Sequence, residues 1–562
     1  MKKIPIGISD FKNIIDNNFY YIDKTLLIKD ILDIGSTAIL IPRPRRFGKS
    51  LNISMLKYYF EKSEIDYSYL FNNLAISQES EEYKKHQGQY PVIFLTFKDV
   101  NANNFELCYD HLKRVIADEY ERHIYLLESP FLNSKNKEEF EIVLNKRGTR
   151  GDYENALKNL SNYLYKYYNK NVIILIDEYD TPIQQGFLSG YYDEVIGFMR
   201  NFLSGGLKDN STLEKGILTG ILRVAKESIF TGLNNFKVYS ILKDEFSSYF
   251  GLLEEEVYDM LKYYNIAFEM DDIKAWYNGY IFGENTIYNP WSILNFTQDY
   301  KYGLIPHWVN TSSNSLIKKL IIAGGVRFKD DILKLIKGES VEKIIDENIV
   351  FADLDTNPDA VWSFLLFTGY LKVLNIHQKN EDLSCELQVP NKEVRTFYRK
   401  TIMEWFKGST TSEKMQEMLQ GLISADILTF EYYFKLFVLN TMSYFDPTGE
   451  EPERVYQAFV LGILVNLSDD YYVKSNRESG FGRYDIALIP KDIKVQEKGI
   501  IFELKKANPV TKETIAEALI AAEKQIETKK YEAELIEAGV SKENIIKIAI
   551  AFQGKEVFMS WK

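Results

Sequence analysis

The sequence predicts an α/β protein with more than one domain: a parallel-sheet domain first, then a mainly helical region, then a second α/β domain. Three observations support this prediction. The chain has 562 residues, more than one hydrophobic core usually holds. Apolar, β-rich runs alternate with helix-like stretches in its first part. Strand and helix patterns return after residue 450, close enough together to form a compact domain.

The first domain, which we place at residues 1–245, is predicted from its apolar runs. They are TAILIP (37–42), YPVIFLTF (90–97), NVIILIDE (171–178), KGILTGI (215–221) and the weaker FKVYSIL (236–242). Strands that are apolar on both faces are typical of a parallel sheet buried between helices. The stretches between the runs carry helix-like patterns, for example at residues 50–63. We therefore expect a doubly wound sheet with helices on both faces.

The remaining chain divides into two predicted parts. Residues 246–385 show helical segments with aromatic loops such as WYNGYIFGENTIYNPWS (276–292), which indicate a lid or connecting region. Residues 386–562 begin with a helical linker. A helix, two close strands, a helix and the final strand NIIKIAIAF (544–552) follow. We expect this last group to be a separate α/β domain.

Composition limits the classes of function. Apolar residues make up 45% and charged residues 26%, as in soluble globular proteins. Two distant cysteines, Cys108 and Cys385, give no disulfide framework, and no signal peptide or membrane-length apolar run is present. We therefore expect a cytoplasmic protein with no membrane partner. The net charge of −12 gives no global basic footprint for nucleic acid, so such a contact would be local or mediated by metal ions.

The segment IPRPRRFGKSLN (41–52) resembles half of a phosphate-binding loop. In the pattern G-x-x-x-x-G-K-[ST], Gly48, Lys49 and Ser50 fill the last three positions, whereas Arg43 replaces the first glycine. Gly48 would let backbone N–H groups approach phosphates, Lys49 would place a charge on the β/γ oxygens, and Ser50 would offer a hydroxyl to Mg²⁺. Gly-Lys-Ser is also a common surface turn, so its place between a strand and a helix favours the nucleotide interpretation.

Two later strands end in residues that suit the same site. NVIILIDE ends in Asp177, which would hold Mg²⁺, and Glu178, which would polarise the attacking water. A helix N-cap is the alternative interpretation of this acid pair. In ILTGILRVAKESIF (217–230), Thr219 could sense the γ-phosphate and Arg223 could act as an arginine finger or sensor. A strand-end threonine and a surface arginine remain equally open.

Several segments together resemble the AAA-ATPase-like proteins. They are YYIDKT (20–25), RPRRFGKS (43–50), LIDEYD (175–180), ILTGILRVAKESIFTGLNN (217–235), WYNGY (276–280) and YNPWS (288–292). The resemblance implies a P-loop NTPase-type ATPase that uses ATP and Mg²⁺, and it maps onto Lys49, Ser50, Asp177 and Glu178. In that family an Arg-Pro-Arg-Arg segment replaces the glycine-rich half of the loop. Whether Arg43, Arg45 and Arg46 hold ATP or face nucleic acid stays open.

A second candidate site lies in GFGRYDIALIP (480–490) and GIIFELKKA (499–507). Glu503 and Lys505 share a strand face because side chains alternate along a strand. Together with Asp485, the carboxylate of Glu503 can hold a divalent cation for attack on a phosphodiester, and Lys505 can position the nucleophile or stabilise developing charge. An exposed strand edge with alternating charges is the alternative.

The Asp485, Glu503 and Lys505 spacing resembles the PD-(D/E)XK nuclease superfamily, which implies a restriction-endonuclease-like fold. ERVYQAFVLGIL (454–464) and AEKQIETKKY (522–531) add to the resemblance, and the upstream acid of such nucleases maps best onto Glu453. Gln457 stands where many relatives have histidine. Gln525 flanks the buried face of its predicted helix, so it would point either towards the sheet or into solvent.

These sites give two competing functions. The first is an ATP-binding and ATP-hydrolysing protein whose Mg²⁺-dependent nuclease domain cleaves DNA or RNA under the control of ATP. The second is a nucleotide switch that binds a partner protein and carries an inactive nuclease-like domain. AAA-like sites often use an arginine from a neighbouring subunit, so a homo-oligomer is compatible with either.

Overall fold

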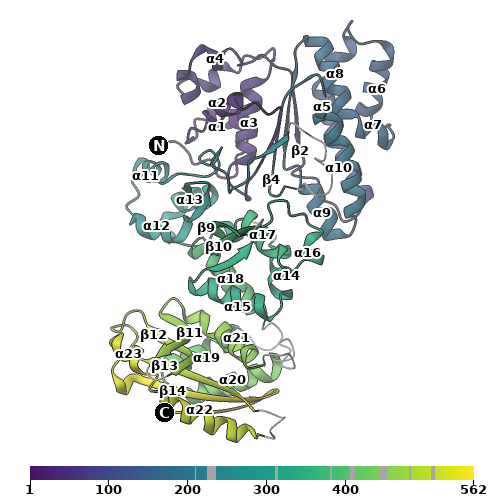
Figure 1. Ribbon diagram of the computed structural model, residues 1–562. Helices are drawn as coiled ribbons and strands as arrows, with labels where there is room; N and C mark the ends of the chain where they lie inside the picture. The colour runs from purple at the N-terminus through teal and green to yellow at the C-terminus, as the bar shows by residue number, and fades with distance from the viewer. Residues whose placement is uncertain are drawn as a thin grey trace. The chain divides into compact units, whose positions relative to one another are not determined.

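The computed structural model describes residues 1–208, 210–223, 236–310, 314–379, 382–405, 412–441, 452–479, 482–507 and 513–562 (Figure 1). The chain forms two compact units. Unit 1 contains Met1–Ser313 and Glu342–Val394, and unit 2 contains Asn314–Val341 and Arg395–Lys562. Our boundaries at residues 245 and 385 remain predictions.

Unit 1 is built on a five-stranded parallel sheet. The strands are β1 (Ala38–Pro42), β2 (Val92–Thr96), β3 (Val172–Asp177), β4 (Leu213–Gly220) and β5 (Phe236–Val238). Their order is β2-β3-β4-β1-β5, and every neighbouring pair is parallel. All residues of β1 and β3 are buried, as the double-sided apolar runs predict. The predicted parallel sheet is therefore confirmed, and the weakest run contributes only a short edge strand.

Helices cover both faces of this sheet (Figure 1). On one side lie α1 (Phe11–Asp16), α2 (Leu27–Asp33) and α3 (Lys49–Phe60), which share a core with β1 and β3. On the other side lie α5 (Phe105–Arg122), α8 (Ala156–Tyr168) and α10 (Tyr192–Leu207). Shorter helices connect them: α4 (Glu81–Lys84), α6 (Ser134–Leu144), α7 (Arg150–Glu154) and α9 (Thr181–Ser189). The domain is doubly wound, and the carboxyl ends of β1, β3 and β4 come together.

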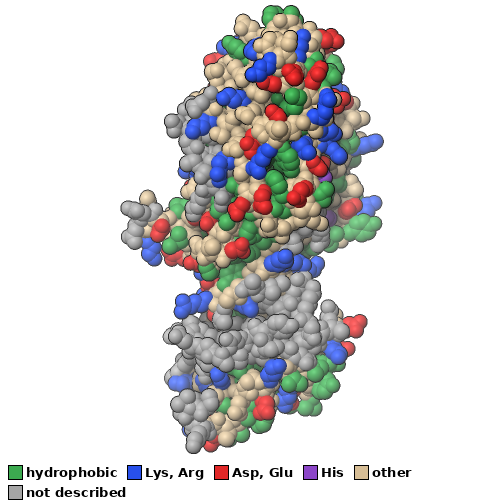
Figure 2. Space-filling model, turned by 90° about the vertical axis from the view of Figure 1, so that its right-hand side faces the viewer, with side chains coloured by type: hydrophobic (Ala, Val, Ile, Leu, Met, Phe, Trp, Pro, Cys, Tyr) green, Lys and Arg blue, Asp and Glu red, His purple; other side chains and the backbone are tan. Residues whose placement is uncertain are grey.

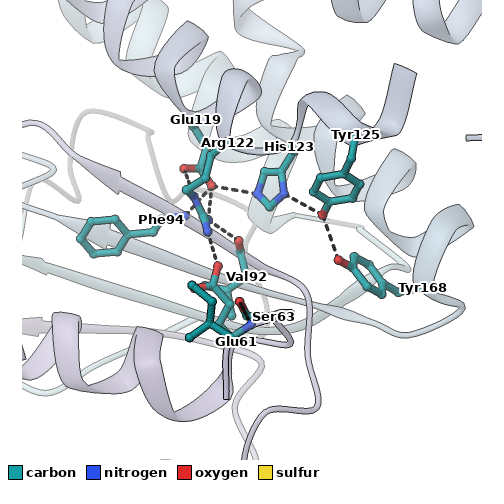
Figure 3. Close-up of polar contacts among 10 residues, drawn as sticks. Glu61, Ser63, Val92, Phe94, Glu119, Arg122, His123, Tyr125 and Tyr168 are labelled. Atoms are coloured by element: carbon teal, nitrogen blue, oxygen red, sulfur yellow. Dashed lines mark hydrogen bonds and ion pairs between the residues drawn. The ribbon is translucent and has the colours of Figure 1, made fainter. Parts of the chain in front are cut away.

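Strand β2 forms one edge of the sheet, and side chains of α5 make hydrogen bonds to its backbone (Figure 3). Glu119 accepts a hydrogen bond from the backbone N–H of Phe94 at 2.9 Å, and Arg122 donates to the carbonyl of Val92 at 2.6 Å. Arg122 also pairs with Glu61 and Glu119. An unpaired strand edge invites pairing with other chains, so this ion network protects the edge as well as stabilising it.

The middle of the chain is mainly helical, as predicted, and also contains short strands that the sequence did not indicate. The helices are α11 (Glu254–Tyr263), α12 (Met270–Tyr277), α13 (Pro290–Asp299), α14 (Ser315–Ala323), α15 (Val326–Lys337), α16 (Asp353–Thr356) and α17 (Ala360–Phe367). The strands are the hairpin β6 (Tyr280–Phe282) and β7 (Asn285–Ile287), and a sheet of β8 (Val341–Ile344), β10 (Asp382–Gln388) and β9 (Lys372–Lys379). β9 is largely exposed, so it lacks the apolar alternation that marks a half-buried strand.

Unit 2 contains a mixed five-stranded sheet. Its strands lie in chain order: β11 (Tyr471–Ser479), β12 (Gly482–Pro490), β13 (Gly499–Lys506), β14 (Ile545–Gln553) and β15 (Glu556–Trp561). β13 and β14 are parallel, and the other pairs are antiparallel. The helices are α18 (Lys392–Trp405), which begins at the end of unit 1, α19 (Ser412–Ile423), α20 (Ile427–Thr441), α21 (Pro452–Leu464), α22 (Ile515–Lys529) and α23 (Ala533–Glu537). Ala522 and Ile526 of α22 join a core with Ile501 and Ala549 of β13 and β14, which confirms the predicted C-terminal α/β domain.

Surface charge and hydropathy agree with the composition. Acidic and basic side chains are interspersed on the face shown in Figure 2. Within the described residues, none of the helices combines the length and the apolar character that crossing a bilayer requires.

Candidate functional site

The predicted phosphate loop (residues 43–50, hereafter the phosphate loop) runs from buried strand β1 into the start of helix α3. Gly48 precedes the helix with a φ of 85°, a left-handed conformation that favours glycine. Lys49, the first residue of α3, exposes only 4% of its surface, and its Nζ donates to the carbonyls of Arg43 and Pro44 at 3.0 Å each. Burial lowers the Lys49 pKa, while the nearby carboxylates of Glu178 and Asp177 oppose this shift. The loop thus holds a buried cation at a helix N-terminus, an arrangement suited to an anionic ligand.

Three elements meet at the carboxylate of Asp177. Ser50 of α3 donates its hydroxyl to Asp177 at 2.6 Å, and Thr219 of β4 donates at 2.8 Å. Asp177 itself ends β3 and is 2% exposed. Burial raises its pKa, and the two hydroxyl bonds limit the rise. A carboxylate beside a serine hydroxyl provides the oxygen ligands that Mg²⁺ prefers, so these residues fit the predicted cation.

The residues after Asp177 form a tightly held acid loop. Glu178 has a φ of 51°, which is uncommon for a residue other than glycine, and its carboxylate accepts a hydrogen bond from Thr181 at 3.3 Å. Asp180 is buried and accepts the backbone N–H groups of Ile221 and Leu222 at 2.8 and 3.0 Å. Asp180 was not among our candidates, although it belongs to the LIDEYD segment. It ties the acid loop to the residues after β4 and so fixes the position of Glu178.

The side chain of Arg43 turns away from the ligand side of the loop. It is fully buried, and its guanidinium donates to the carbonyls of Pro42 and Tyr239 at 2.8 and 2.6 Å. It lies 5.2 Å from the ring centre of Phe250 and 5.4 Å from that of Phe282. Burial lowers its pKa to about 9. This position favours a packing role for Arg43, whereas its backbone carbonyl still contacts Lys49.

Arg45 and Arg46 line the pocket next to the loop. Arg45 donates to the side-chain oxygen of Gln184 at 2.8 Å, and the Arg46 guanidinium lies 4.2 Å from the ring centre of Trp291. Arg223 is half-buried after β4, and its Nε has no hydrogen-bond partner among the described residues. The rest of its segment, residues 224–235, lies outside the described residues.

A pocket of about 430 Å³ opens beside the phosphate loop. Its charged and polar lining includes Arg45, Arg46, Lys49, Ser50 and Glu178. Its apolar lining includes Pro5, Ile8, Ile14, Trp291 and Leu294. The apolar residues come from the N-terminal segment and α13, outside the loop in sequence. Trp291 belongs to the YNPWS segment of the resemblance, whereas Pro5, Ile8, Ile14 and Leu294 lie outside every motif that we singled out. The pocket therefore combines a cationic wall with an apolar wall.

The second site forms where β12 and β13 separate. Their pairing runs as far as Ile486 opposite Phe502, so Asp485 and Glu503 occupy the next positions. The Asp485 carboxylate accepts the backbone N–H of Leu504 at 2.7 Å. Glu503 is 1% exposed, and the Nζ of Lys505 lies 3.7 Å from its carboxylate. The structure thus brings the three predicted residues together.

Helix α22 and the residue after its C-cap each add a polar group near this site. Gln525 donates to the hydroxyl of Tyr531 at 3.0 Å, and Tyr531 is fully buried. Tyr531 packs in the same core as Ile501 of β13. Burial raises the Tyr531 pKa, the bond from Gln525 lowers it, and the charges of Glu503 and Asp485 raise it further. Gln525 therefore points towards the sheet and not into solvent. Tyr531 ends the AEKQIETKKY segment but was not among our candidates.

The upstream helix α21 also reaches the site. Gln457 donates to the backbone carbonyl of Asp485 at 3.1 Å. The Glu453 side chain lies outside the described residues. Among the described residues, no group of three or more His, Cys, Asp or Glu side chains could enclose a metal ion. A cation between Asp485 and Glu503 would need further oxygen ligands, as Mg²⁺ usually does when it retains water.

Comparisons with known proteins cover both sites. The family described as "Predicted AAA-ATPase" matches residues 5–230, and the family described as "PD-(D/E)XK nuclease superfamily" matches residues 451–562. The chain thus contains a predicted AAA-ATPase domain followed by a PD-(D/E)XK nuclease-superfamily domain. The AAA-ATPase-like match contains the phosphate loop and Asp177, and the nuclease-superfamily match contains Asp485, Glu503 and Lys505. Residues 231–450 lie between the two.

The chain is also similar to a curated relative from Azotobacter chroococcum. The two are 24% identical over 404 residues, which is 72% of this chain and 70% of the relative. That relative is described as an uncharacterized protein in the vnfD 5′ region. This description assigns no activity to the relative.

Proposed function

We propose that this AAA-ATPase-like protein binds and hydrolyses ATP in unit 1, and that ATP controls Mg²⁺-dependent cleavage of nucleic acid by its nuclease domain. The observation that carries the proposal is the meeting of Ser50, Asp177 and Thr219 beside the buried amine of Lys49. DNA or RNA as substrate and a cytoplasmic location remain part of the proposal.

The residues of unit 1 divide the work of ATP hydrolysis. Lys49 exchanges its bonds to two loop carbonyls for bonds to the β/γ-phosphates. Ser50 and Asp177 hold Mg²⁺, which when bound neutralises charge that develops on the phosphates. Glu178 orients the attacking water, and its fixed backbone favours a single orientation. Thr219 senses the γ-phosphate through Asp177, and Arg223 completes the site from this subunit or a neighbouring one.

The two walls of the pocket suit the two parts of a nucleotide. Arg45 and Arg46 supply charge for the phosphates, and the apolar wall, with Trp291 and Leu294, suits a planar base. The Arg46 guanidinium stacks on the ring of Trp291, so a base that uses this ring face must displace Arg46. Binding of the base would therefore release Arg46 towards the phosphates.

In unit 2, Asp485 and Glu503 hold a divalent cation, which when bound supplies Lewis-acid stabilisation to a phosphodiester. Lys505 stabilises the negative charge of the transition state or orients the attacking water. Gln525 holds the phenol of Tyr531 beside the acids, and Gln457 holds the backbone of Asp485. These contacts fix the geometry of the acid pair.

One observation favours the alternative, a nucleotide switch with an inactive nuclease-like domain. Glu503 exposes only 1% of its side chain, and Asp485 already accepts the N–H of Leu504. An acid pair used only for packing would have the same features.

Cleavage assays separate these functions. Purified protein with Mg²⁺ is incubated with single- and double-stranded DNA and RNA, with and without ATP. The double variant Glu503→Ala/Lys505→Ala is the test, and Lys506→Ala, which removes the adjacent lysine, is the matched control. Cleavage by the wild type and the control but not by the double variant supports the nuclease. Equal background in all three excludes it and leaves the switch.

The ATP site is tested with Lys49→Ala, for which Lys57→Ala at the other end of α3 is the control. We expect the binding of a fluorescent ATP analogue to be lost only in Lys49→Ala. Unchanged binding would show that the phosphate loop is wrongly placed. Sizing of the protein with and without ATP tests whether a homo-oligomer forms.

A further inference from the structure

The phosphate loop has a feature that its sequence does not explain. It lacks the first of the two glycines in the pattern, and Arg46, a residue other than glycine, adopts a φ of 68°. Such a conformation is strained in residues other than glycine and persists only where the surroundings enforce it. The source of that enforcement is visible in contacts from residues 280–393, a segment that lies wholly outside both family matches.

Trp308 is the contact that reaches the loop backbone. Its indole N–H donates to the carbonyl of Arg45 at 3.1 Å, in the middle of the loop. The side chain is buried and packs against Tyr280 and Tyr370, with ring centres 6.1 and 5.1 Å away. The indole therefore cannot turn away from the loop without opening an aromatic core.

Glu393 holds Trp308 in turn. Its buried carboxylate accepts the backbone N–H groups of His307 and Trp308, and the hydroxyl of Ser292 donates to its second oxygen at 2.7 Å. Ser292 belongs to α13, which also carries Trp291 of the pocket wall. One carboxylate thus connects the segment that holds the loop with the helix that lines the pocket.

Two side chains of the loop are held from the same side. Phe47 is fully buried, with its ring centre 4.9 Å from that of Tyr280 and 5.2 Å from that of Phe282. Pro44 packs on Gly369, where an added Cβ would lie 3.0 Å from the proline ring and where φ is +88°. The first half of the loop is therefore anchored by residues distant in sequence.

We infer that Trp308 and Glu393 are positioning residues for nucleotide binding, which hold the arginine-rich loop in its phosphate-binding shape although the first glycine of the pattern is missing. The inference rests on the proposed ATP site. Arg45 follows directly after Arg43 and Pro44, whose carbonyls hold Lys49, so its fixed carbonyl sets the direction of that part of the loop. A loop fixed before ATP arrives avoids the entropy cost of ordering during binding.

The first test is Trp308→Phe, which keeps an aromatic ring and removes only the N–H donor. Its control is Trp362→Phe, at a buried tryptophan of α17. In the absence of nucleotide, we expect backbone amides in peptides covering residues 43–48 to exchange faster in Trp308→Phe than in the wild type. In Trp362→Phe the exchange rate of these peptides should equal that of the wild type. Exchange equal to the wild type in both variants would overturn the inference whether or not the protein binds ATP.

ATP titrations and turnover give the second readout. We expect kcat/KM for ATP to fall about ten-fold in Trp308→Phe, with a thermal unfolding midpoint close to that of the control. A purely structural tryptophan would lower the midpoint and leave kcat/KM unchanged, which would overturn the inference. No ATP binding by the wild type would instead refute the proposed function.

Glu393→Gln keeps the inference testable if Trp308→Phe does not fold. The amide retains one acceptor oxygen for His307 and Trp308, so we expect a folded protein with a smaller, same-direction change in exchange at residues 43–48. If exchange becomes faster than in the wild type only around residue 307, and is unchanged at residues 43–48, Glu393 does not act on the loop.

Discussion

Replacing Glu393 by glutamine is expected to remove a pH dependence from the stability of unit 1. Burial raises the pKa of this carboxyl from 4.5 to about 7, although the bonds from Ser292 and from the backbone of residues 307–309 oppose the rise. The folded state therefore keeps a proton that the unfolded chain has already released. Between pH 4.5 and 7 the folded protein binds more protons than the unfolded one, so stability falls as pH rises.

The magnitude follows from the same two values. A difference of about 2.5 pKa units corresponds to a free energy of unfolding on the order of 3 kcal/mol. This contribution is complete below pH 4.5 and is lost above pH 7. Glutamine does not titrate, so the stability of Glu393→Gln should lack this component.

The assay is guanidinium unfolding between pH 4.5 and 8, followed by the fluorescence of tryptophans such as Trp291 and Trp308. The free energy of unfolding of the wild type minus that of Glu393→Gln should fall by about 3 kcal/mol as pH rises across this range, because other groups cancel in the comparison. Glu284→Gln, at an exposed position, serves as control and should stay parallel to the wild type. If Glu393→Gln also stays parallel, Glu393 is ionised in the fold and the reasoning is wrong.

Three further changes test other parts of the structure. Asp177→Asn should abolish Mg²⁺-dependent ATP hydrolysis, whereas the protein should still bind nucleotide in the absence of Mg²⁺. Phosphate release measures hydrolysis, and nucleotide titrations without Mg²⁺ measure binding. Retained hydrolysis would contradict the role assigned to Asp177. Glu119→Gln should destabilise unit 1 by about 3 kcal/mol at pH 7 and remove the stability that the wild type loses as pH falls from 4.5 to about 2. Burial alone would raise the Glu119 pKa, but the charge of Arg122 and the hydrogen bonds from His123 and Arg122 together outweigh burial and lower this pKa to about 2. Chemical denaturation of both proteins at pH 7 and pH 3 measures this effect. If Glu119→Gln lowers the free energy of unfolding by the same amount at both pH values, the reasoning is refuted. Tyr531→Phe should reduce the rate of nucleic-acid cleavage about ten-fold or more without changing the thermal unfolding midpoint. Cleavage at the wild-type rate would show that the Tyr531 hydroxyl has no role.

The sheet of unit 1 was predictable because its strands are short apolar runs between helical patterns. β1 and β3 are buried along their whole length, and such strands leave a strong signal in the sequence. β6, β7 and β9 were not predicted. They are short or exposed, and their pairing depends on neighbours that periodicity does not reveal.

The candidate sites were predictable where a residue type and its spacing carry the chemistry. Lys49, Ser50, Asp177, Glu503 and Lys505 stand at positions that their motifs define, and the structure places each group together. Their roles in ATP hydrolysis and cleavage remain proposals. Asp180 and Tyr531 were missed, although both belong to segments that we singled out, because a buried carboxylate or phenol takes its role from what packs around it.

By itself, the sequence determined the two α/β domains and the residues that can carry phosphate chemistry, because burial patterns and motifs are local properties of the chain. Only the tertiary structure decided what the arginines of the loop do. Arg43 is packed among aromatic rings, Arg46 stacks on Trp291, and the carbonyl of Arg45 accepts the indole N–H of Trp308. These aromatic residues lie more than 190 positions from the loop in the sequence. The free energy of burying a charge or of fixing a carbonyl depends on such contacts, which form only when the chain folds.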